Sequence, residues 1–510
     1  MTDIVSRIWA GDDTVWGPAG QPEVANRLGW LTIAQRTQAE LADIVAFAEE
    51  VRDAGVKNVV LLGMGGSSLG PEVIRRSFGP QAGWPLLHVL DSTDAAAIAA
   101  VDAATDPAST LYLVSTKSGG TIETLSAFAH FHAGQPDGSH FVAITDPGSS
   151  LVELAEKHSF RRTFLNDPNI GGRYSVLSYF GVVPAALMGA DVAALLAGGV
   201  AAEEECRADD NAAFRQGVAV GKLALEGRNK LTFIIDPPLQ AFGLWVEQLI
   251  AESTGKEGKG VLPVADEPLG VLDEYGDDRV FVHLANRTAP DSRNTANAAA
   301  LEGAGHPVFT FPTDGPGDLG RIAFLSEFAT AVAGWTLGIN PFNQPNVQEA
   351  KDNTKQALEA RTPAQEDATD DALHALLGTA GPPDYVAIMG YVAPSEDFDA
   401  EVAELRAVIR DATQSTTTFG YGPRFLHSTG QLHKGGPKTG RFLQLFHTAA
   451  PDIEVPGQDF TFETLKASQA IGDLQTLRSH GLPAERVTLE GDDPAAALGA
   501  LTARLKEMLG

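Results

Sequence analysis

VVLLGMGGSSLG, residues 59–70, begins with an apolar run of strand length and continues as a turn of small and hydroxyl-bearing residues. LVSTKSGGTIETL, residues 113–125, repeats this pattern further along the chain. A segment of helical period follows each turn, from Pro71 in the first case and from Thr121 in the second. Both stretches therefore predict a strand, a loop and a helix, with the loop at the carboxyl end of a parallel strand.

The two loops have the chemistry of an anion site. A helix that begins at such a loop directs its free backbone N–H groups and its positive dipole end at the ligand, and glycines let an anion come close. Hydroxyl groups add donors, from Ser67, Ser68, Thr116, Ser118 and Thr121. We expect a bound phosphate group, although a Gly/Ser-rich turn after a strand is also an ordinary βα connection.

Nucleotide signatures fit these loops less well. Ser68 stands where the dinucleotide fingerprint has its third glycine, and Lys117 precedes its glycines, whereas a P-loop lysine follows them. A nucleotide-dependent oxidoreductase is therefore the weaker hypothesis.

Composition narrows the class of protein further. A chain of 510 residues is long enough for about two to four domains. With 37 Lys and Arg against 66 Asp and Glu, the net charge of −29 disfavours nucleic acid and membrane surfaces as partners, so an anionic ligand must be held locally. Cys206 is the one cysteine, which indicates a reducing compartment. With no apolar leader or long apolar stretch, we expect a soluble cytoplasmic protein.

Apolar runs alternate with amphipathic segments along most of the chain, which predicts an α/β protein with parallel sheets. We expect a helical N-terminal segment (1–57), two doubly wound domains (58–200 and 201–360), an acidic linker with one short helix (361–384) and a smaller α/β unit (385–510). The expected strands are 59–62, 86–90, 111–115, 141–145, 231–235, 280–284, 308–311, 385–389, 441–446 and 487–489. A single helix is expected from 178 to 196.

Three further stretches are polar in ways that a fold alone does not require. GGRYS places Arg173 after two glycines, which is also compatible with a surface loop. WVEQLIAESTGK places Gln248 and Glu252 on one face near a helix end, although an ordinary exposed glutamate is the commoner case. NPFNQPNVQEAK opens a helix that carries Lys351.

A fourth stretch, GPRFLHSTGQLHKGGPKTG, concentrates positive charge and two histidines, His427 and His433, in an acidic chain. With no cysteine or carboxylate nearby, their spacing is a poor zinc signature. We therefore expect an acid–base or anion-binding role and no metal.

Together, LGMGGSSLGP, STKSGGTIET, GGRYS, ESTGK with its upstream Gln248, and NPFNQPNV followed by Lys351 resemble the phosphoglucose isomerase family over residues 55–360. The resemblance implies two sugar-isomerase (SIS) domains. HSTGQLHKGG and FETLKASQAIGDL resemble the isomerase part of the fused transaldolase/phosphoglucose isomerase proteins, although no transaldolase part is visible.

This resemblance implies a glycolytic and gluconeogenic enzyme that interconverts glucose 6-phosphate and fructose 6-phosphate through ring opening and an enediolate, without a cofactor. Glu252 matches the family's base, and Arg173 the arginine that stabilises the enediolate. Lys351 matches the lysine near the ring oxygen. The matches that line the substrate are Thr116, Ser118 and Thr121 at the phosphate and Gly66, Ser67 and Gln248 at the sugar.

The chain departs from the family pattern at the ring-opening histidine. Between Gly258 and Phe342 only His283 and His306 occur, and neither is followed by Gly-Gln. The pattern H-x-x-G-Q appears instead at His427, which we expect to act in its own subunit or in a partner's. His433 is the competing candidate, and Lys466 is a weaker alternative to Lys351.

Two alternatives remain open for the function. The site could take another sugar with a 6-anion, such as mannose 6-phosphate, or the protein could be a non-catalytic sugar-phosphate sensor. The sensor is disfavoured because it has no need of Glu252, Arg173 and His427 together. By resemblance we expect a homodimer that binds a small sugar phosphate.

Overall fold

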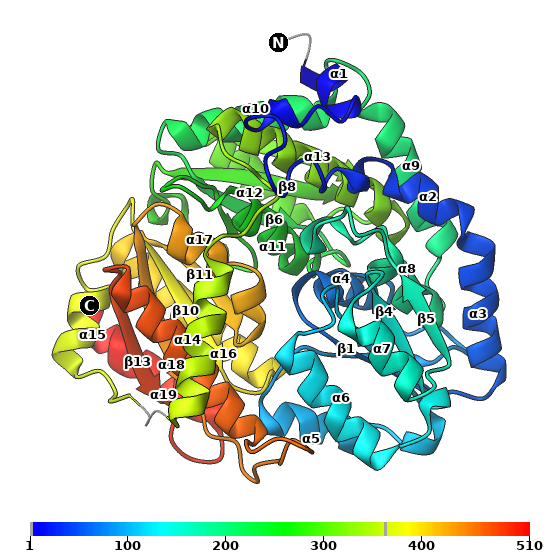
Figure 1. Cartoon of the computed structure of the whole chain (residues 1–510). Coiled ribbons are helices and arrows are strands. Elements are labelled where there is room, and N and C mark those ends of the chain that lie inside the picture. The colour runs from blue at the N-terminus through cyan, green and yellow to red at the C-terminus, as the bar shows by residue number, and fades with distance from the viewer. Residues whose placement is uncertain (1–3, 362–364) are drawn as a thin grey trace.

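The structure, a computed structural model, describes residues 4–361 and 365–510. Its described strands form three parallel sheets with the orders β2-β1-β3-β4-β5, β7-β6-β8-β9 and β11-β10-β12-β13. In each sheet the second strand along the chain pairs with one side of the first, and the third pairs with the other side. Figure 1 shows the three sheets around a common centre, with helices on their faces. The predicted α/β class, with two doubly wound parallel-sheet units and a further α/β unit, is confirmed.

The first unit follows a helical N-terminal segment. That segment contains α1 (Ile4–Trp9), α2 (Ile33–Ala39) and α3 (Leu41–Asp53). The strands are β1 (Asn58–Gly63), β2 (Leu86–Leu90), β3 (Thr110–Ser115), β4 (Phe141–Thr145) and β5 (Arg162–Leu165). The helices between them are α4 (Leu69–Phe78), α5 (Ala95–Ala104), α6 (Ile122–Gly134) and α7 (Ser150–Lys157).

Three helices lead into the second unit: α8 (Tyr179–Leu187), α9 (Val192–Glu205) and α10 (Ala212–Leu225). Its strands are β6 (Lys230–Ile235), β7 (Leu262–Val264), β8 (Arg279–Asn286) and β9 (Val308–Thr313). Its remaining helices are α11 (Phe242–Thr254), α12 (Ser292–Gly303) and α13 (Leu319–Leu337).

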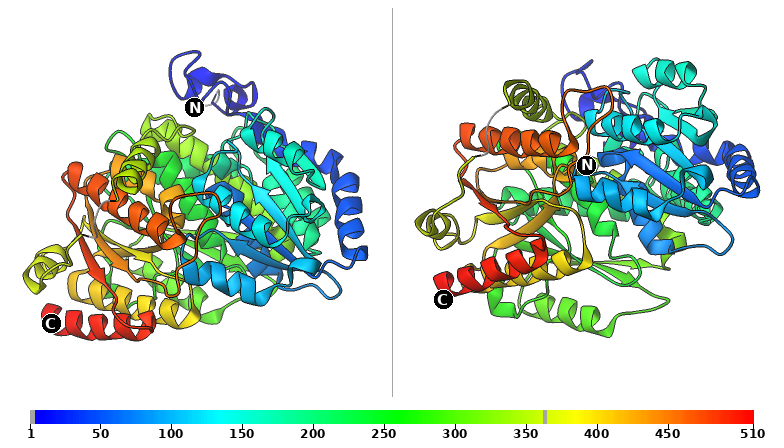
Figure 2. Two further views of the ribbon diagram at one scale, coloured as in Figure 1. Left: turned by 60° about the horizontal axis from the view of Figure 1, so that its bottom comes forward. Right: turned by 90° about the horizontal axis from the view of Figure 1, so that it is seen from below.

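The third unit repeats the strand order of the second. Its strands are β10 (Tyr385–Tyr391), β11 (Thr416–Tyr421), β12 (Gly440–Phe446) and β13 (Ala484–Thr488). Its helices are α14 (Val347–Ala360), α15 (Asp370–Leu377), α16 (Glu396–Thr413), α17 (Gly430–Gly435), α18 (Phe462–Ser479) and α19 (Pro494–Leu509). Both views of Figure 2 show α19, in red, at the outer edge of this unit beside α16.

Some sequence expectations were wrong in detail. The helix expected over 178–196 is two helices, because Gly189 has a φ of +77° and the Asp191 side chain caps the N-terminus of α9. Three strands were missed. β5 is short and half-buried, β7 contains a proline, and β11 opens with three polar threonines. The last strand lies at Ala484–Thr488 rather than 487–489.

The units are joined by shared cores. One apolar cluster runs from the N-terminal helices through the first sheet to α13, and a second joins Ala251 and Leu262 of the second unit to Tyr385 and Phe442 of the third. Such continuous burial holds the three sheets in one arrangement. The division of the chain at residues 57, 200, 360 and 384 stays a prediction.

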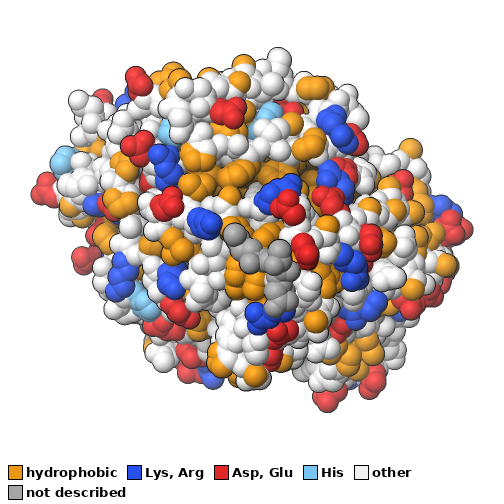
Figure 3. Space-filling view, turned by 90° about the horizontal axis from the view of Figure 1, so that it is seen from above, with side chains coloured by type: hydrophobic (Ala, Val, Ile, Leu, Met, Phe, Trp, Pro, Cys, Tyr) orange, Lys and Arg blue, Asp and Glu red, His pale blue; other side chains and the backbone are white. Residues whose placement is uncertain are grey.

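The acidic excess is not gathered on the face nearest the N-terminus, where red and blue side chains are interspersed (Figure 3). Among the described residues, no helix combines the length and the apolar character needed to cross a membrane.

Candidate functional site

Both Gly/Ser loops lie at the carboxyl edge of the first sheet. β1 and β3 are neighbours, and their last residues, Gly63 and Ser115, are paired. The loops that follow are therefore side by side, at the edge where doubly wound sheets bind their ligands.

The loop after β3 has the form of an anion site. Gly119 has a φ of +76°, which turns the chain into α6. The hydroxyls of Thr116 and Thr121 lie 2.8 Å apart, and Ser118 is exposed. Thr121 precedes the first helical residue without capping it, so the first turn of α6 keeps N–H groups that an anion can accept.

The loop after β1 is packed against two other segments. A Cβ on Gly66 would lie 2.0 Å from the carbonyl oxygen of Gly172, and one on Gly65 would lie 2.9 Å from that of His427. Glycine is therefore required for these backbones to meet. The adjoining Ser67 is buried. Through these contacts the first loop brings the Arg173 and His427 segments to the same edge.

Glu252 and Arg173 form the centre of this region. Glu252 lies in the last turn of α11, and its Oε2 is 3.4 Å from Nη1 of Arg173. Arg173 is only 2% exposed, so the surface-loop alternative for GGRYS is wrong. A cation held this close to a carboxylate fixes the position of the carboxylate and supplies charge where an anion would develop.

Arg173 is held from every side. Its Nε donates to Ser253 at 2.8 Å, Nη1 donates to Gln344 at 2.9 Å, and Nη2 donates to the carbonyl oxygens of Pro341 and Asn343. Since all three nitrogens are engaged, the guanidinium acts in this arrangement as a fixed positive charge.

Lys256, which the sequence did not single out, binds the same loop as Arg173. Its Nζ donates to the carbonyl oxygens of Asn340 and Asn343 at 2.5 and 2.6 Å. Burial and the neighbouring Arg173 lower the pKa of the Lys256 ammonium well below its usual range. The sequence ESTGK contained the only hint, because its lysine follows a helix end.

Gln248 connects Glu252 to His427. Its Nε2 donates to the backbone carbonyl of His427 at 2.8 Å and lies 3.3 Å from Oε2 of Glu252. The Oε1 of Gln248 is buried without a partner in the described chain. A polar group of this kind is one that a bound ligand could satisfy.

Glu123 is a candidate positioning residue that sequence reasoning missed. Its Oε1 lies 2.9 Å from Nε2 of His427 and accepts a hydrogen bond from Gln469 at 2.7 Å. Burial alone would raise the pKa of the Glu123 carboxyl, but His427, followed by Lys351, lowers it overall. The signal was available, since Glu123 lies two residues after Thr121 at the start of α6.

Gln431, the last residue of the H-x-x-G-Q pattern, is fully buried and joins three segments. Its Nε2 donates to the carbonyl of Gly255 and to the side chain of Asn346, and its Oε1 accepts from the backbone of Asn346, all at 2.9 Å. The His427 segment is thereby fastened to the end of α11 and to the start of α14, which carries Lys351.

His433, the competing candidate for the ring-opening histidine, is packed in an aromatic core. His433 is buried among the rings of Tyr385, Phe425 and Phe442, and neither of its ring nitrogens has a hydrogen-bond partner in the described chain. Burial, followed by the charge of Lys434, lowers the pKa of His433 to about 3.

The two lysines differ in their surroundings. Lys466 is fully buried in ion pairs with Asp94 and Glu463, as expected of a packing residue. Lys351 is exposed on α14 and is near enough to Glu123 to affect its pKa.

The described residues contain no cluster of three or more metal-ligating side chains. What they bring together is a carboxylate beside a fixed cation, a histidine paired with a buried carboxylate, and a hydroxyl-rich loop at a helix start. This set suits proton transfer on an anionic substrate.

Comparison with known proteins agrees with a site for proton transfer on an anionic substrate. The family model described as phosphoglucose isomerase matches residues 35–262. The glucose-6-phosphate isomerase of Rubrobacter xylanophilus is 31% identical over 372 residues, which span 62% of this chain and 86% of that protein. The chain belongs to the phosphoglucose isomerase family. A second relative, the glucose-6-phosphate isomerase of Carboxydothermus hydrogenoformans, is 29% identical, covering 64% of this chain and 84% of its own length.

Solved structures support the fold of a phosphoglucose isomerase. A hypothetical protein from Thermus thermophilus superposes with a TM-score of 0.61 at 25% identity, covering 70% of this chain and 94% of its own. A glucose-6-phosphate isomerase from Chlamydia trachomatis gives 0.59 at 19% identity, covering 71% and 84%. As a member of this family the protein is an enzyme, an aldose–ketose isomerase of the glucose-6-phosphate isomerase class.

Proposed function

We propose that this enzyme interconverts glucose 6-phosphate and fructose 6-phosphate through ring opening and an enediolate, with Glu252 as the base. The observation that supports this most directly is the linked set of Arg173, Glu252, Gln248 and His427 within one chain. It comes from the first, second and third units, and it lies beside the loop expected to hold a phosphate.

The 6-phosphate would bind at the start of α6. Hydroxyls of Thr116, Ser118 and Thr121 and the free N–H groups of the first helical turn offer donors to its oxygens. Gly66, Ser67 and Gln248 would line the sugar, with the unpartnered Oε1 of Gln248 accepting a hydrogen bond from a hydroxyl.

Ring opening would use His427 from the same chain. Because its Nε2 is hydrogen-bonded to Glu123, Nδ1 is left to transfer a proton to or from the ring oxygen. The buried carboxylate of Glu123 orients the ring and stabilises its protonated form, as a triad carboxylate does. Lys351 would lie near the same end of the sugar.

Isomerisation would use Glu252. Its carboxylate removes the proton at C2 of the open aldose and returns it to C1, while the electron pair moves through the enediolate and the hydroxyl proton passes from O2 to O1. Arg173 stabilises the negative charge through its field, since its nitrogens remain bound to the protein. No metal or nucleotide takes part in this scheme.

The test is turnover of fructose 6-phosphate by the full chain in excess chelator. Glu252→Gln is expected to lower kcat by about 10²–10⁴-fold while substrate binding is largely kept. His427→Ala should reduce turnover most for the ring-closed sugar. Loss below about tenfold in Glu252→Gln would remove Glu252 as the base.

If wild type binds fructose 6-phosphate without turnover, another sugar with a 6-anion, such as mannose 6-phosphate, becomes the preferred substrate. The non-catalytic sensor is disfavoured by the family to which the chain belongs. A homodimer, a cytoplasmic location and a relationship to the isomerase part of the fused transaldolase proteins remain proposals.

A further inference from the structure

A cavity of about 480 Å³ lies where the three units meet, and the proposed chemistry makes no use of it. Its walls come from α4, the start of α11, the segment after β7, α16, the end of β11, and residues 424–429. The volume falls within the range of small-molecule sites.

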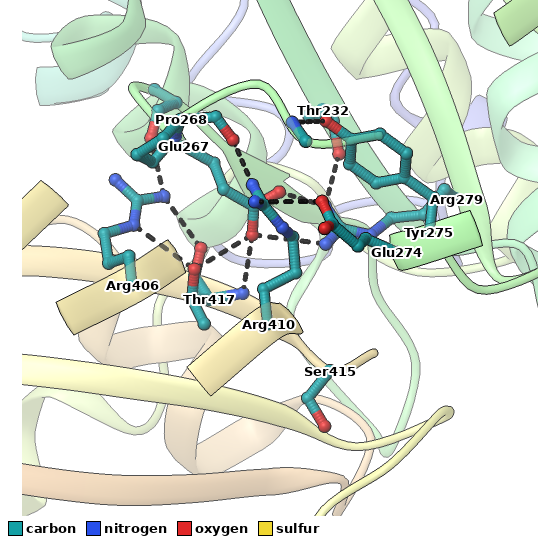
Figure 4. Close-up of polar contacts among 12 residues, drawn as sticks. Thr232, Glu267, Pro268, Glu274, Tyr275, Arg279, Arg406, Arg410, Ser415 and Thr417 are labelled. Carbon is teal, nitrogen blue, oxygen red and sulfur yellow. Dashed lines mark hydrogen bonds and ion pairs between the residues drawn. The ribbon is translucent and has the colours of Figure 1, made fainter. Parts of the chain in front are cut away.

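Three polar side chains present unpartnered groups to this cavity. Arg406 is 3% exposed; its Nε and Nη2 bind Thr417 and the carbonyl of Ala265, but Nη1 has no partner in the described chain. Figure 4 shows this terminal nitrogen without a contact. Glu247 is 9% exposed. Its Oε1 accepts a hydrogen bond from the backbone N–H of Ala265, whereas its Oε2 has no partner in the described chain.

The third group is Asp266. It lines the cavity as an exposed residue, and within the described residues it has neither a hydrogen bond nor an ion pair, so its carboxylate is free to accept from a ligand in place of water. Its φ of +51° is uncommon for a residue other than glycine. Burial raises the pKa of Glu247 to about 8, against the charge of Arg406.

The other cations of the lining are already engaged. Arg424 binds Asp91 through two hydrogen bonds, and Arg76 is paired with Glu72. A phosphate would therefore meet Arg406 as the one lining cation without a carboxylate partner in the described chain, beside the carboxyls of Glu247, Asp266 and Asp399, which is unfavourable. An amine would meet the positive charge of Arg406 at close range.

A neutral ligand with both donors and acceptors satisfies all three groups. The aromatic side chains of Phe419, Tyr421 and Phe425 add apolar faces to the lining, which suit the C–H faces of a sugar ring. We propose that this cavity binds an uncharged polyhydroxylated molecule of mono- to disaccharide size, and that its occupancy alters the active site.

The route to the active site is short. On α11, Leu244 and Glu247 face the cavity, whereas Gln248 and Glu252 face the catalytic side. In the third unit, Phe425 and Ser428 line the cavity on either side of His427. A ligand that displaces α11 or the segment 425–428 therefore changes the geometry of the hydrogen bond between Gln248 and His427. This second half of the inference rests on the proposed function, whereas the binding site itself does not.

The test is calorimetric titration of the full chain with D-glucose, sorbitol and maltose, each with and without saturating glucose 6-phosphate. At least one should bind, and its binding should survive the sugar phosphate. Asp266→Asn should weaken it about tenfold, the loss expected for a hydrogen bond to a charged group, and Glu247→Leu, which removes both oxygens of a carboxyl that is largely protonated at neutral pH, should also weaken it. Asn tolerates the positive φ, so Asp266→Asn should fold.

Two further variants sharpen the test. Ala403→Phe, on the cavity face of α16, should abolish binding by filling the space. Asp273 is an exposed residue outside the lining, and Asp273→Asn removes one negative charge just as Asp266→Asn does. This control variant should bind the sugar as wild type does. The inference is overturned if none of the three sugars binds, if glucose 6-phosphate displaces them, or if Ala403→Phe binds as wild type does.

Inorganic phosphate and ethylamine are the contrasting probes. Binding of either one, lost in Ala403→Phe, would overturn the assignment to an uncharged ligand. The bound sugar should also change the isomerisation rate of wild type but not of Ala403→Phe. If Glu252→Gln keeps full turnover yet binds the sugar normally, the proposed base fails while the cavity assignment stands.

Discussion

The side-chain amide of Gln248 donates a hydrogen bond to the backbone carbonyl of His427 at 2.8 Å. The two residues are far apart in the sequence and belong to the second and third units. Because the same amide lies 3.3 Å from Glu252, it sets the spacing between the proposed base and the proposed ring-opening group.

Replacing Gln248 by leucine should therefore misplace both groups at once. We expect kcat for fructose 6-phosphate to fall by about 10²-fold, the effect of a displacement near 1 Å. The exposed change Gln38→Leu serves as the control. Steady-state kinetics decide the matter, and near-normal turnover in Gln248→Leu would show that the bond does not position the site.

Glu123→Gln should separate orientation from proton transfer. The variant keeps the shape of the side chain but loses the charge beside His427, so kcat should fall by about 10²-fold for the ring-closed substrate and much less for an open-chain substrate. KM should change little. An equal loss for both substrates would argue against a role through His427.

The same variant carries a pH signature. Because the folded pKa of Glu123 is lowered, its carboxylate stabilises the fold above the ordinary pKa of glutamate, and this contribution is lost as the pH falls through the folded value. The free energy of unfolding of Glu123→Gln should thus lie furthest below wild type near neutral pH. The exposed Glu153→Gln should show no such trend.

His433→Leu tests the competing histidine. With a folded pKa of about 3, His433 is neutral at working pH and has no hydrogen-bond partner in the described chain, so the variant should keep turnover within about twofold. Since the unfolded chain takes up a proton near pH 6.5, wild type loses stability as the pH falls from there towards 3.

The leucine variant lacks that loss. The unfolding free energy of His433→Leu should therefore rise relative to that of wild type by about 1.4 kcal/mol for each pH unit that the pH falls between about 6.5 and 3. Urea titrations at several pH values measure it. A large drop in kcat, with the fold intact, would instead return His433 to the list of candidates for acid–base chemistry.

Glu327→Met should stabilise the protein. Glu327 is fully buried on α13, and neither carboxyl oxygen has a partner in the described chain. Burial, followed by Glu203, raises its pKa well above the usual range. Wild type therefore loses stability as the pH rises above the unfolded value near 4.5, whereas methionine does not.

The difference in unfolding free energy between Glu327→Met and wild type should grow by about 1.4 kcal/mol per pH unit from about pH 4.5 towards neutrality. Thermal unfolding at about pH 5 and about pH 7 would show it, with the exposed Glu302→Met as the control. If Glu327→Met lowers Tm equally at both pH values, the carboxyl has an unrecognised partner.

Local sequence was sufficient for much of the fold. The apolar runs and Gly/Ser turns around residues 59–70 and 113–125 predict strand, loop and helix because both periodicity and turn chemistry are local properties. β7, with Pro263, and β11, with its threonines, were missed because pairing with a neighbouring strand overrides their weak local preference.

For the candidate site, too, some features follow from local sequence and others only from tertiary contacts. Residue types predict an anion site, and the resemblance to the phosphoglucose isomerase family singles out Glu252, Arg173 and His427, whose roles stay predictions. Three other features emerge only in the folded chain: Glu123 accompanies His427, His433 is packed among aromatic rings, and Arg173 is held by its own protein. Burial and contact depend on elements that are distant in the chain, and no local pattern carries that information.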